Sequence, residues 1–152
     1  MSQVKPIPDG YRSVTPTLVV DGGARALDFY ERAFGAVVVS RLEAGGMLVH
    51  GEIRIGDSLV TVCDSMPGYG LRAPDREAPV PSSLGIYCED VDALHARAVA
   101  AGATEINAVA DQFHGDRTGS VRGPFGHRSS LATHIEDVSP EEMERRMAES
   151  AS

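Results

Sequence analysis

Residues 24–36 read ARALDFYERAFGA, and residues 91–103 read VDALHARAVAAGA. Apolar side chains recur at helical spacing in the first segment, and Gly35 is typical of a left-handed helix end. When the two segments are aligned without a gap, the identical pairs are Ala26/Ala93, Leu27/Leu94, Ala33/Ala100, Gly35/Gly102 and Ala36/Ala103. The pattern predicts one helix in each half of the chain and indicates a duplicated module.

Strand-like segments surround the two predicted helices in the same order. Pro16 restricts the first strand to an edge or margin of its sheet. The predicted elements of the first half are strands at 13–20, 37–42, 47–55 and 58–63 with a helix at 24–34. Those of the second half are strands at 84–88, 104–106, 119–122 and 128–133, a helix at 91–101 and a loop at 107–118. The predicted fold class is α+β, with two βαβββ modules.

We expect one domain over residues 1–152. Its predicted parts are a loose tail at 1–11, module one at about 12–64, a Pro- and Gly-rich linker at 65–82, module two at about 83–134 and a C-terminal helix at about 139–150. For that last helix, Ser139 is the expected N-cap, Pro140 fits the first helical position and Glu142 can close a capping box.

Composition excludes several classes of protein. The chain has 14 Lys and Arg against 22 Asp and Glu, a net charge of −8, so a nucleic-acid partner is not expected. No stretch approaches the about 18 apolar residues that span a bilayer, and the N-terminus lacks the apolar core of a signal peptide. We therefore expect a cytoplasmic protein with no membrane partner. Cys63 and Cys88 lie in separate apolar segments and are predicted to be buried free thiols.

Several motifs together resemble the vicinal oxygen chelate superfamily (glyoxalase, bleomycin resistance protein and dioxygenase), and within it the PhnB-like branch. The segments that carry the resemblance are 13–21, 26–36, 50–58, 89–92, 111–117, 124–128 and 132–142. It covers about residues 11–147. It implies that the two modules form a cup-shaped mixed sheet that holds a small molecule, in many members on a divalent metal. It does not specify an activity.

The resemblance places the usual metal-ligand positions at Thr15, Ser83 and Ser130, with a further carboxylate position near Glu52 or Arg54. Neutral hydroxyl groups are poor ligands for zinc, iron or nickel. We therefore expect no metal and no other cofactor.

Strand alternation indicates which side chains share the face of the expected cup. His50 and Glu52 lie two residues apart on one strand, so their side chains could meet. Such a pair could form a general base, help to hold a metal, or be a structural pair whose charge Arg54 balances. His114 is either a ligand contact or an exposed loop residue, and His127 is expected to pack in a turn. The candidate ligand-binding residues are Thr15, Thr17, His50, Glu52, Arg54, Ser83, Tyr87, His114 and Ser130.

Three functions remain open from the sequence. The first is a metal-free protein that binds a small, mostly apolar or aromatic molecule, for drug or metabolite sequestration. The second is an enzyme of lyase, isomerase or dioxygenase type with an altered site, whose candidate catalytic residues are His50 and Glu52. The third is a degenerate module that serves only as an interaction partner. In each case we expect a homodimer, because open modules leave unpaired strand edges.

Overall fold

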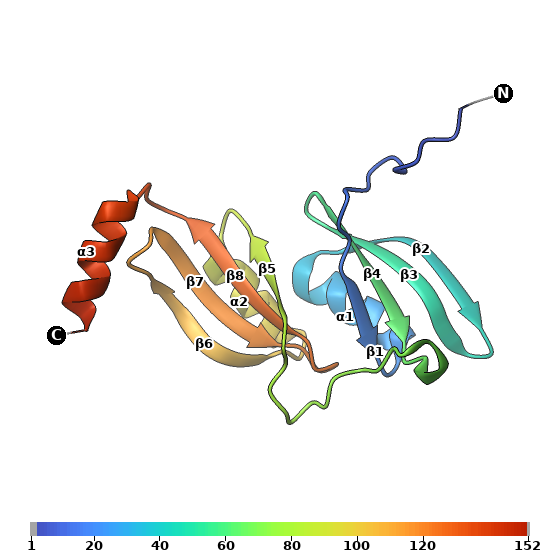
Figure 1. The fold of residues 1–152 in the computed structure, drawn as a ribbon. Coiled ribbons are helices and arrows are strands. Elements are labelled where there is room, and N and C mark those ends of the chain that lie inside the picture. The colour runs from blue at the N-terminus through green and yellow to red at the C-terminus, as the bar shows by residue number, and fades with distance from the viewer. Residues whose placement is uncertain (1–2, 152) are drawn as a thin grey trace. The chain divides into compact units, whose positions relative to one another are not determined.

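The computed structural model describes residues 3–151. Its contacts divide the chain into two compact units, which are described separately. The first contains the residues up to Pro79 together with the turn Phe125–His127, and the second contains the remainder. Each unit has a four-stranded mixed sheet with one helix packed on one face (Figure 1), so the predicted fold class, α+β with two βαβββ modules, is confirmed.

The first unit consists of β1 (Thr17–Val20), α1 (Gly23–Phe34), β2 (Val37–Ala44), β3 (Met47–Ile55) and β4 (Ser58–Asp64), followed by the short 3-10 helix η1 (Pro67–Tyr69). The strand order is β1-β4-β3-β2, with β1 parallel to β4. Pro16 cannot donate a ladder hydrogen bond, and it lies just before this edge strand, which begins at Thr17 rather than at Ser13. Its carbonyl still accepts from Thr61 N at 3.0 Å.

Helix α1 presents an apolar stripe to this sheet. Leu27 and Tyr30 are buried, and they belong to the same core as Ile53 and Val62 of the sheet. Burial raises the pKa of the Tyr30 phenol well above its ordinary value. Gly35 has the predicted left-handed conformation (φ 66°) and ends the helix. One face of the sheet therefore packs against α1 and forms the core, and the opposite face is available for a site.

The turn Phe125–His127 belongs to this first core. The Phe125 ring lies 6.2 Å from that of Phe29, centroid to centroid, and is buried. His127 Nε2 forms a 2.8 Å hydrogen bond with the Val19 carbonyl oxygen. The expectation that His127 packs in a turn is confirmed.

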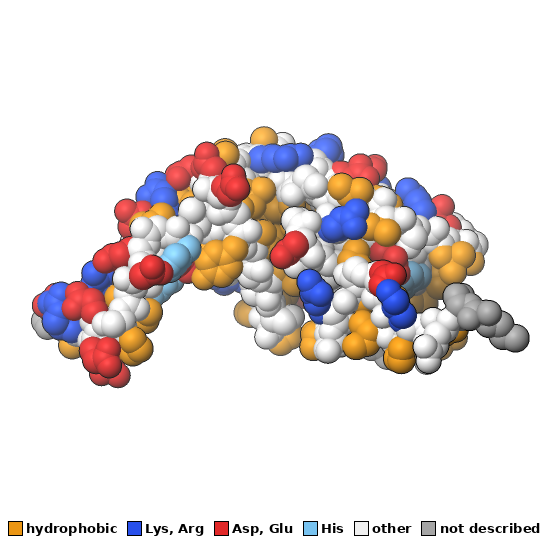
Figure 2. Space-filling model, turned by 90° about the horizontal axis from the view of Figure 1, so that it is seen from above, with side chains coloured by type: hydrophobic (Ala, Val, Ile, Leu, Met, Phe, Trp, Pro, Cys, Tyr) orange, Lys and Arg blue, Asp and Glu red, His pale blue; other side chains and the backbone are white. Residues whose placement is uncertain are grey.

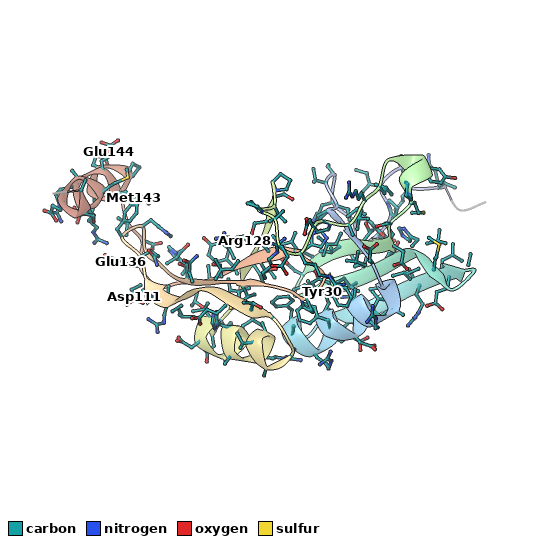
Figure 3. The ribbon with its side chains drawn as sticks, turned by 90° about the horizontal axis from the view of Figure 1, so that it is seen from below. Tyr30, Asp111, Arg128, Glu136, Met143 and Glu144 are labelled. Atoms are coloured by element: carbon teal, nitrogen blue, oxygen red, sulfur yellow. The ribbon has the colours of Figure 1, made fainter. Side chains whose placement is uncertain are left out.

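The second unit consists of β5 (Ser83–Tyr87), α2 (Val91–Ala100), β6 (Thr104–Asp111), β7 (Asp116–Arg122), β8 (Arg128–His134) and α3 (Pro140–Ser150). Its strand order, β5-β8-β7-β6, repeats that of the first sheet, and α2 packs on one face. Ser139 caps α3 as expected, because its side chain accepts from Glu142 N. Met143 and Glu144 lie on α3, and Glu136 lies on the segment that leads to it (Figure 3). Arg146 of α3 pairs with Glu136 at 2.8 Å.

The predicted loop at 107–118 is wrong. β6 continues to Asp111, and β7 already begins at Asp116, so the connection is short. The pairing of β6 with β7 shifts register between Glu105 and Asn107 and again between Asn107 and Ala110. These bulges interrupt the apolar–polar alternation by which a strand is recognised in a sequence.

The carboxylate of Asp64 joins three elements of the first unit. Its Oδ1 accepts from Gly22 N (2.8 Å) and Gly23 N (2.9 Å) at the start of α1, and its Oδ2 accepts from Leu48 N (2.7 Å) in β3. A Cβ on Gly23 would lie 2.4 Å from Leu48 Cβ, so only glycine permits this approach of helix and strand. In the second unit the Thr133 hydroxyl of β8 likewise accepts from the start of its helix, from Val91 N at 2.9 Å.

Replacing this carboxylate should destabilise the fold. We expect Asp64→Ala to lower the free energy of unfolding by about 3 kcal/mol, because backbone donors at the start of α1 and in β3 lose their acceptor. Asp64→Asn, which keeps one acceptor oxygen, should lie between Asp64→Ala and the natural chain. The matched control is Asp57→Ala in an exposed turn, for which we expect a change within about 0.5 kcal/mol. Urea unfolding measures all three, and equal stabilities of Asp64→Ala and Asp57→Ala would contradict the role of Asp64.

Candidate functional site

A hollow of about 410 Å³ opens on the face of the first sheet opposite α1. Four of the predicted ligand-binding residues line it together: Thr15, Thr17, His50 and Glu52. The other lining residues, which were not predicted to line a site, are Tyr11, Val49, Thr61, Cys63, Met66 and Leu71. Arg54, which was predicted with the first group, lies outside this lining and is exposed.

The polar floor of the hollow follows from the strand register. Thr17, Thr61 and Glu52 are successive partners across β1, β4 and β3, so their side chains form one row. The Oγ1 atoms of Thr17 and Thr61 are 2.6 Å apart. β3 pairs Leu42 with His50 and Glu43 with Leu48, which leaves Val49 as an extra, bulged residue. The bulge brings the neighbours Val49 and His50 into the same lining, although a regular strand would send them to opposite faces.

Glu52 is the electrostatic centre of the hollow. It accepts hydrogen bonds from the Tyr11 hydroxyl and, at 3.0 Å, from Ser40 Oγ, and His50 Nε2 lies 3.1 Å from its Oε1. The hydrogen bond from Tyr11, followed by that from His50, lowers the pKa of the Glu52 carboxyl. The same bond raises the pKa of the Tyr11 phenol. The site therefore presents an ionised carboxylate at neutral pH.

The predicted contact of His50 with Glu52 is present, but Arg54 does not balance its charge. Tyr11 and Ser40 supply donors to the carboxylate instead. Tyr11 comes from the segment expected to be a loose tail, and no local pattern links it to Glu52, 41 residues away.

Cys63 borders the hollow as a thiol. It is buried, and burial raises its pKa, with a further contribution from the nearby Asp64 carboxylate. A thiol with a raised pKa is a weak nucleophile at neutral pH. Cys63 and Cys88 are both free; Cys63 is buried, as predicted, and Cys88 is partly buried. Cys63 therefore contributes packing to the hollow.

In the second unit the predicted residues Ser83, Tyr87 and Ser130 lie on the sheet face opposite α2, and His114 lies in the turn between β6 and β7. Ser83, Gly85 and Tyr87 of β5 pair with Arg128, Ser130 and Ala132 of β8. Ser83 Oγ lies 3.4 Å from Ser130 Oγ. Ser129 is buried on the other face, as alternation requires.

A second group of polar side chains surrounds Asp116, which is buried. Its Oδ2 accepts from the Tyr87 hydroxyl at 2.6 Å, and its Oδ1 lies 2.7 Å from His134 Nδ1. His114 Nδ1 lies 3.8 Å from the same carboxylate. The donors, Tyr87 first, lower the pKa of Asp116. Asp116 and His134 were not among the predicted site residues.

Arg117 does not form an ion pair with its sequence neighbour Asp116. The Arg117 guanidinium pairs with Asp92 of α2 at 2.8 Å and with Asp111 of β6 at 2.9 Å. Adjacent residues of a strand point to opposite faces, so Asp116 and Arg117 cannot share a partner surface. Arg117 braces the helix side, and Asp116 belongs to the open side.

The metal that the resemblance implies does not fit the donors present. Thr15, Ser83 and Ser130 offer neutral hydroxyls, and Ser83 and Ser130 lie close enough for their hydroxyls to contact each other. Among residues 3–151 there is also no cluster of three or more His, Cys, Asp or Glu side chains placed to hold a metal ion. The arrangement favours hydrogen bonding over metal coordination.

Charges of both signs are interspersed on the face seen in Figure 2, without a large patch of either sign. No helix among residues 3–151 has both the length and the apolar character needed to cross a bilayer.

His134 should titrate above its ordinary pKa of 6.5. Its Nε2 lies 2.8 Å from Asp137 Oδ1, and this carboxylate, followed by Asp116, raises its pKa. The folded state holds the proton more tightly, so the stabilisation is complete below pH 6.5 and is lost as pH rises through the raised value. An NMR titration of the imidazole should give a midpoint above 6.5 that falls in Asp137→Asn but not in the exposed control Asp75→Asn. A midpoint of 6.5 or below in the natural chain would contradict this pairing.

Comparison with known proteins places this geometry in a family. The model of the glyoxalase/bleomycin resistance protein/dioxygenase superfamily matches residues 12–131. An uncharacterized protein of Mycobacterium bovis is 38% identical over 140 residues, which are 90% of this chain and 92% of that protein.

Two solved structures share the fold. The crystal structure of TioX from Micromonospora sp. ML1 matches with a TM-score of 0.64 and 23% identity over 84% of this chain and 100% of that one. A putative 3-demethylubiquinone-9 3-methyltransferase, PhnB protein, from Bacillus cereus matches with a TM-score of 0.60 and 18% identity over 80% and 99%. Together with the duplicated βαβββ topology, the family match over most of the chain shows that the protein belongs to the glyoxalase/bleomycin resistance protein/dioxygenase superfamily.

Proposed function

We propose that this protein binds a small, mostly apolar or aromatic molecule without a metal, and that its purpose is drug or metabolite sequestration. The observation that carries the proposal is the hollow of about 410 Å³ around Glu52. Ligand pockets of proteins commonly have volumes of this order and combine apolar walls with a few fixed polar groups.

The lining supports this class of ligand. Val49, Met66 and Leu71 provide apolar contacts, and methionine adapts its shape to aromatic rings. Glu52 and His50 provide oriented polar groups. Sequestration needs binding alone, so a site without a metal or an activated nucleophile is sufficient for it.

The His50–Glu52 contact favours one other function. An imidazole held by a carboxylate is the usual arrangement of a general base, so an enzyme of lyase, isomerase or dioxygenase type is the second candidate. However, Glu52 also accepts from Tyr11 and Ser40. Chemical alteration of a bound compound distinguishes the two candidates.

We also propose membership of the PhnB-like branch, which is supported by the motifs at 50–58, 111–117 and 124–128. Within the second unit, we propose as ligand-binding residues Ser83, Tyr87, His114 and Ser130. The cytoplasmic location and the absence of a nucleic-acid partner stay predictions.

A screen of aromatic antibiotics and related metabolites by thermal shift tests the proposed binding. A ligand at about 100 times its Kd should raise Tm by roughly 5–10 °C and should be recovered unchanged by mass spectrometry. Leu71→Asp, which introduces a charge into the hollow, should raise Kd about tenfold or more. Val99→Asp is the matched control, because Val99 is exposed on α2 outside the lining and outside the β2 edge. Recovery of an altered compound, with the alteration lost in His50→Ala, would establish the enzyme instead.

The purified protein should contain no stoichiometric transition metal, because Thr15, Ser83 and Ser130 are poor ligands. Elemental analysis after purification without an affinity tag measures this content. About one metal per chain that survives dialysis against a chelator would overturn the metal-free site.

The protein should be a homodimer. β2 is an edge strand that exposes Val37, Val39 and Leu42, and burying such an edge against a second copy is favourable. Light scattering at micromolar concentration should give twice the mass of the chain, 16.1 kDa. A mass equal to that of one chain would contradict this proposal.

A further inference from the structure

One wall of the hollow comes from outside the sheet. Tyr11 precedes β1 and belongs to no helix or strand, whereas His50 and Ser40 lie within β3 and β2. A turn directs it inward, because Tyr11 N donates to the Pro8 carbonyl at 3.1 Å and Gly10 has a left-handed conformation (φ 85°). The residues from Gln3 to Gly10 that lead to it are exposed. The segment that leads to Tyr11 is therefore not buried, and the phenol is bound to the sheet by its hydrogen bond with Glu52.

We propose that Tyr11 is an internal ligand of the hollow. Its hydroxyl forms the hydrogen bond with Glu52 that the hydroxyl of a bound phenol would form in its place. This inference rests on the proposed binding function and names the chemical class of the ligand: a phenol, or another flat aromatic molecule with a hydrogen-bond donor.

Of the three side chains that bond to Glu52, Tyr11 is the one that a bound phenol can most easily replace. Ser40 and His50 are carried by paired strands, and moving them would disturb the sheet. Tyr11 can leave with its segment, and a phenol that replaces it restores the same charge-assisted hydrogen bond. The carboxylate disfavours an anionic guest, because a like charge beside it would be repelled.

The walls fit the ring of such a guest. Val49, Met66 and Leu71 border the hollow together with Tyr11, so an aromatic ring that enters meets apolar side chains. The sulfur of Met66 can contact a ring favourably.

Internal occupancy has a measurable consequence. If Tyr11 is bound to Glu52 for most of the time, the apparent affinity for a phenol is the intrinsic affinity multiplied by the fraction of molecules in which Tyr11 has left Glu52. Removing the phenol should therefore strengthen the binding of a phenol, the reverse of what removal of an ordinary contact residue does.

The test compares two probes in an NMR titration of the full chain. p-Cresol has the ring and hydroxyl of a tyrosine side chain, and 4-methylanisole has the same ring without a donor. We expect p-cresol to bind Tyr11→Ala about tenfold more tightly than the natural chain, and Tyr11→Phe more tightly as well. The preference for p-cresol over 4-methylanisole should disappear when Glu52→Leu, which removes both acceptor oxygens, is added to Tyr11→Ala. The matched control is Tyr69→Ala, since Tyr69 is 84% exposed and lies outside the lining.

An unchanged or weaker affinity of Tyr11→Ala for p-cresol, in a variant whose spectrum is that of a folded chain, overturns the inference. Tyr11 would then be part of the wall. If aromatic compounds of the screen bind the natural chain while Tyr11→Ala gains nothing, this inference alone fails. If neither the screened compounds nor p-cresol bind any of the chains, the proposed binding function fails with it.

Discussion

The hydrogen bonds of the Asp64 carboxylate are the constraint on which the first unit depends. They join the end of β4 to the start of α1, 41 and 42 residues away, and to the beginning of β3, 16 residues away. The start of a helix leaves backbone N–H groups without partners, and one side chain at the end of the neighbouring strand provides the acceptor. Once α1 is held in this way, it covers one sheet face, and the polar row of Thr17, Thr61 and Glu52 faces the other side. The position of the hollow is thus a consequence of how the helix is capped.

The open face of each unit contains a carboxylate that receives hydrogen bonds from a tyrosine and contacts a histidine. In the first unit the carboxylate is Glu52, with Tyr11 and His50, and in the second it is Asp116, with Tyr87 and His134. A carboxylate that is partly removed from water requires hydrogen-bond donors. This requirement explains why the two groups are alike. Their likeness does not follow from duplication, because Tyr11 precedes its first strand whereas Tyr87 ends β5. The matching groups are therefore found only from the coordinates.

Features encoded locally could be predicted from the sequence. The order of strands and helices, the left-handed end at Gly35 and the edge position after Pro16 each depend on residues that are neighbours in the chain. The contact of His50 with Glu52 also follows from alternation in a single strand. Tyr11 could not be found in this way, because its partner lies 41 residues away. The true length of β6 was hidden for another reason: its bulges break the period of two that marks a strand.

The same reasoning separates what determines affinity from what determines orientation at this site. A donor that reaches Glu52 replaces a hydrogen bond that the carboxylate already has, either with the protein or with water, so the net gain from this exchange is modest. The apolar surface of Val49, Met66 and Leu71 has no such compensation, since covering it removes it from water. For the proposed ligand, the apolar walls would therefore provide most of the binding free energy. Glu52 would select the orientation of the ligand and reject one that leaves this partly buried carboxylate short of a donor.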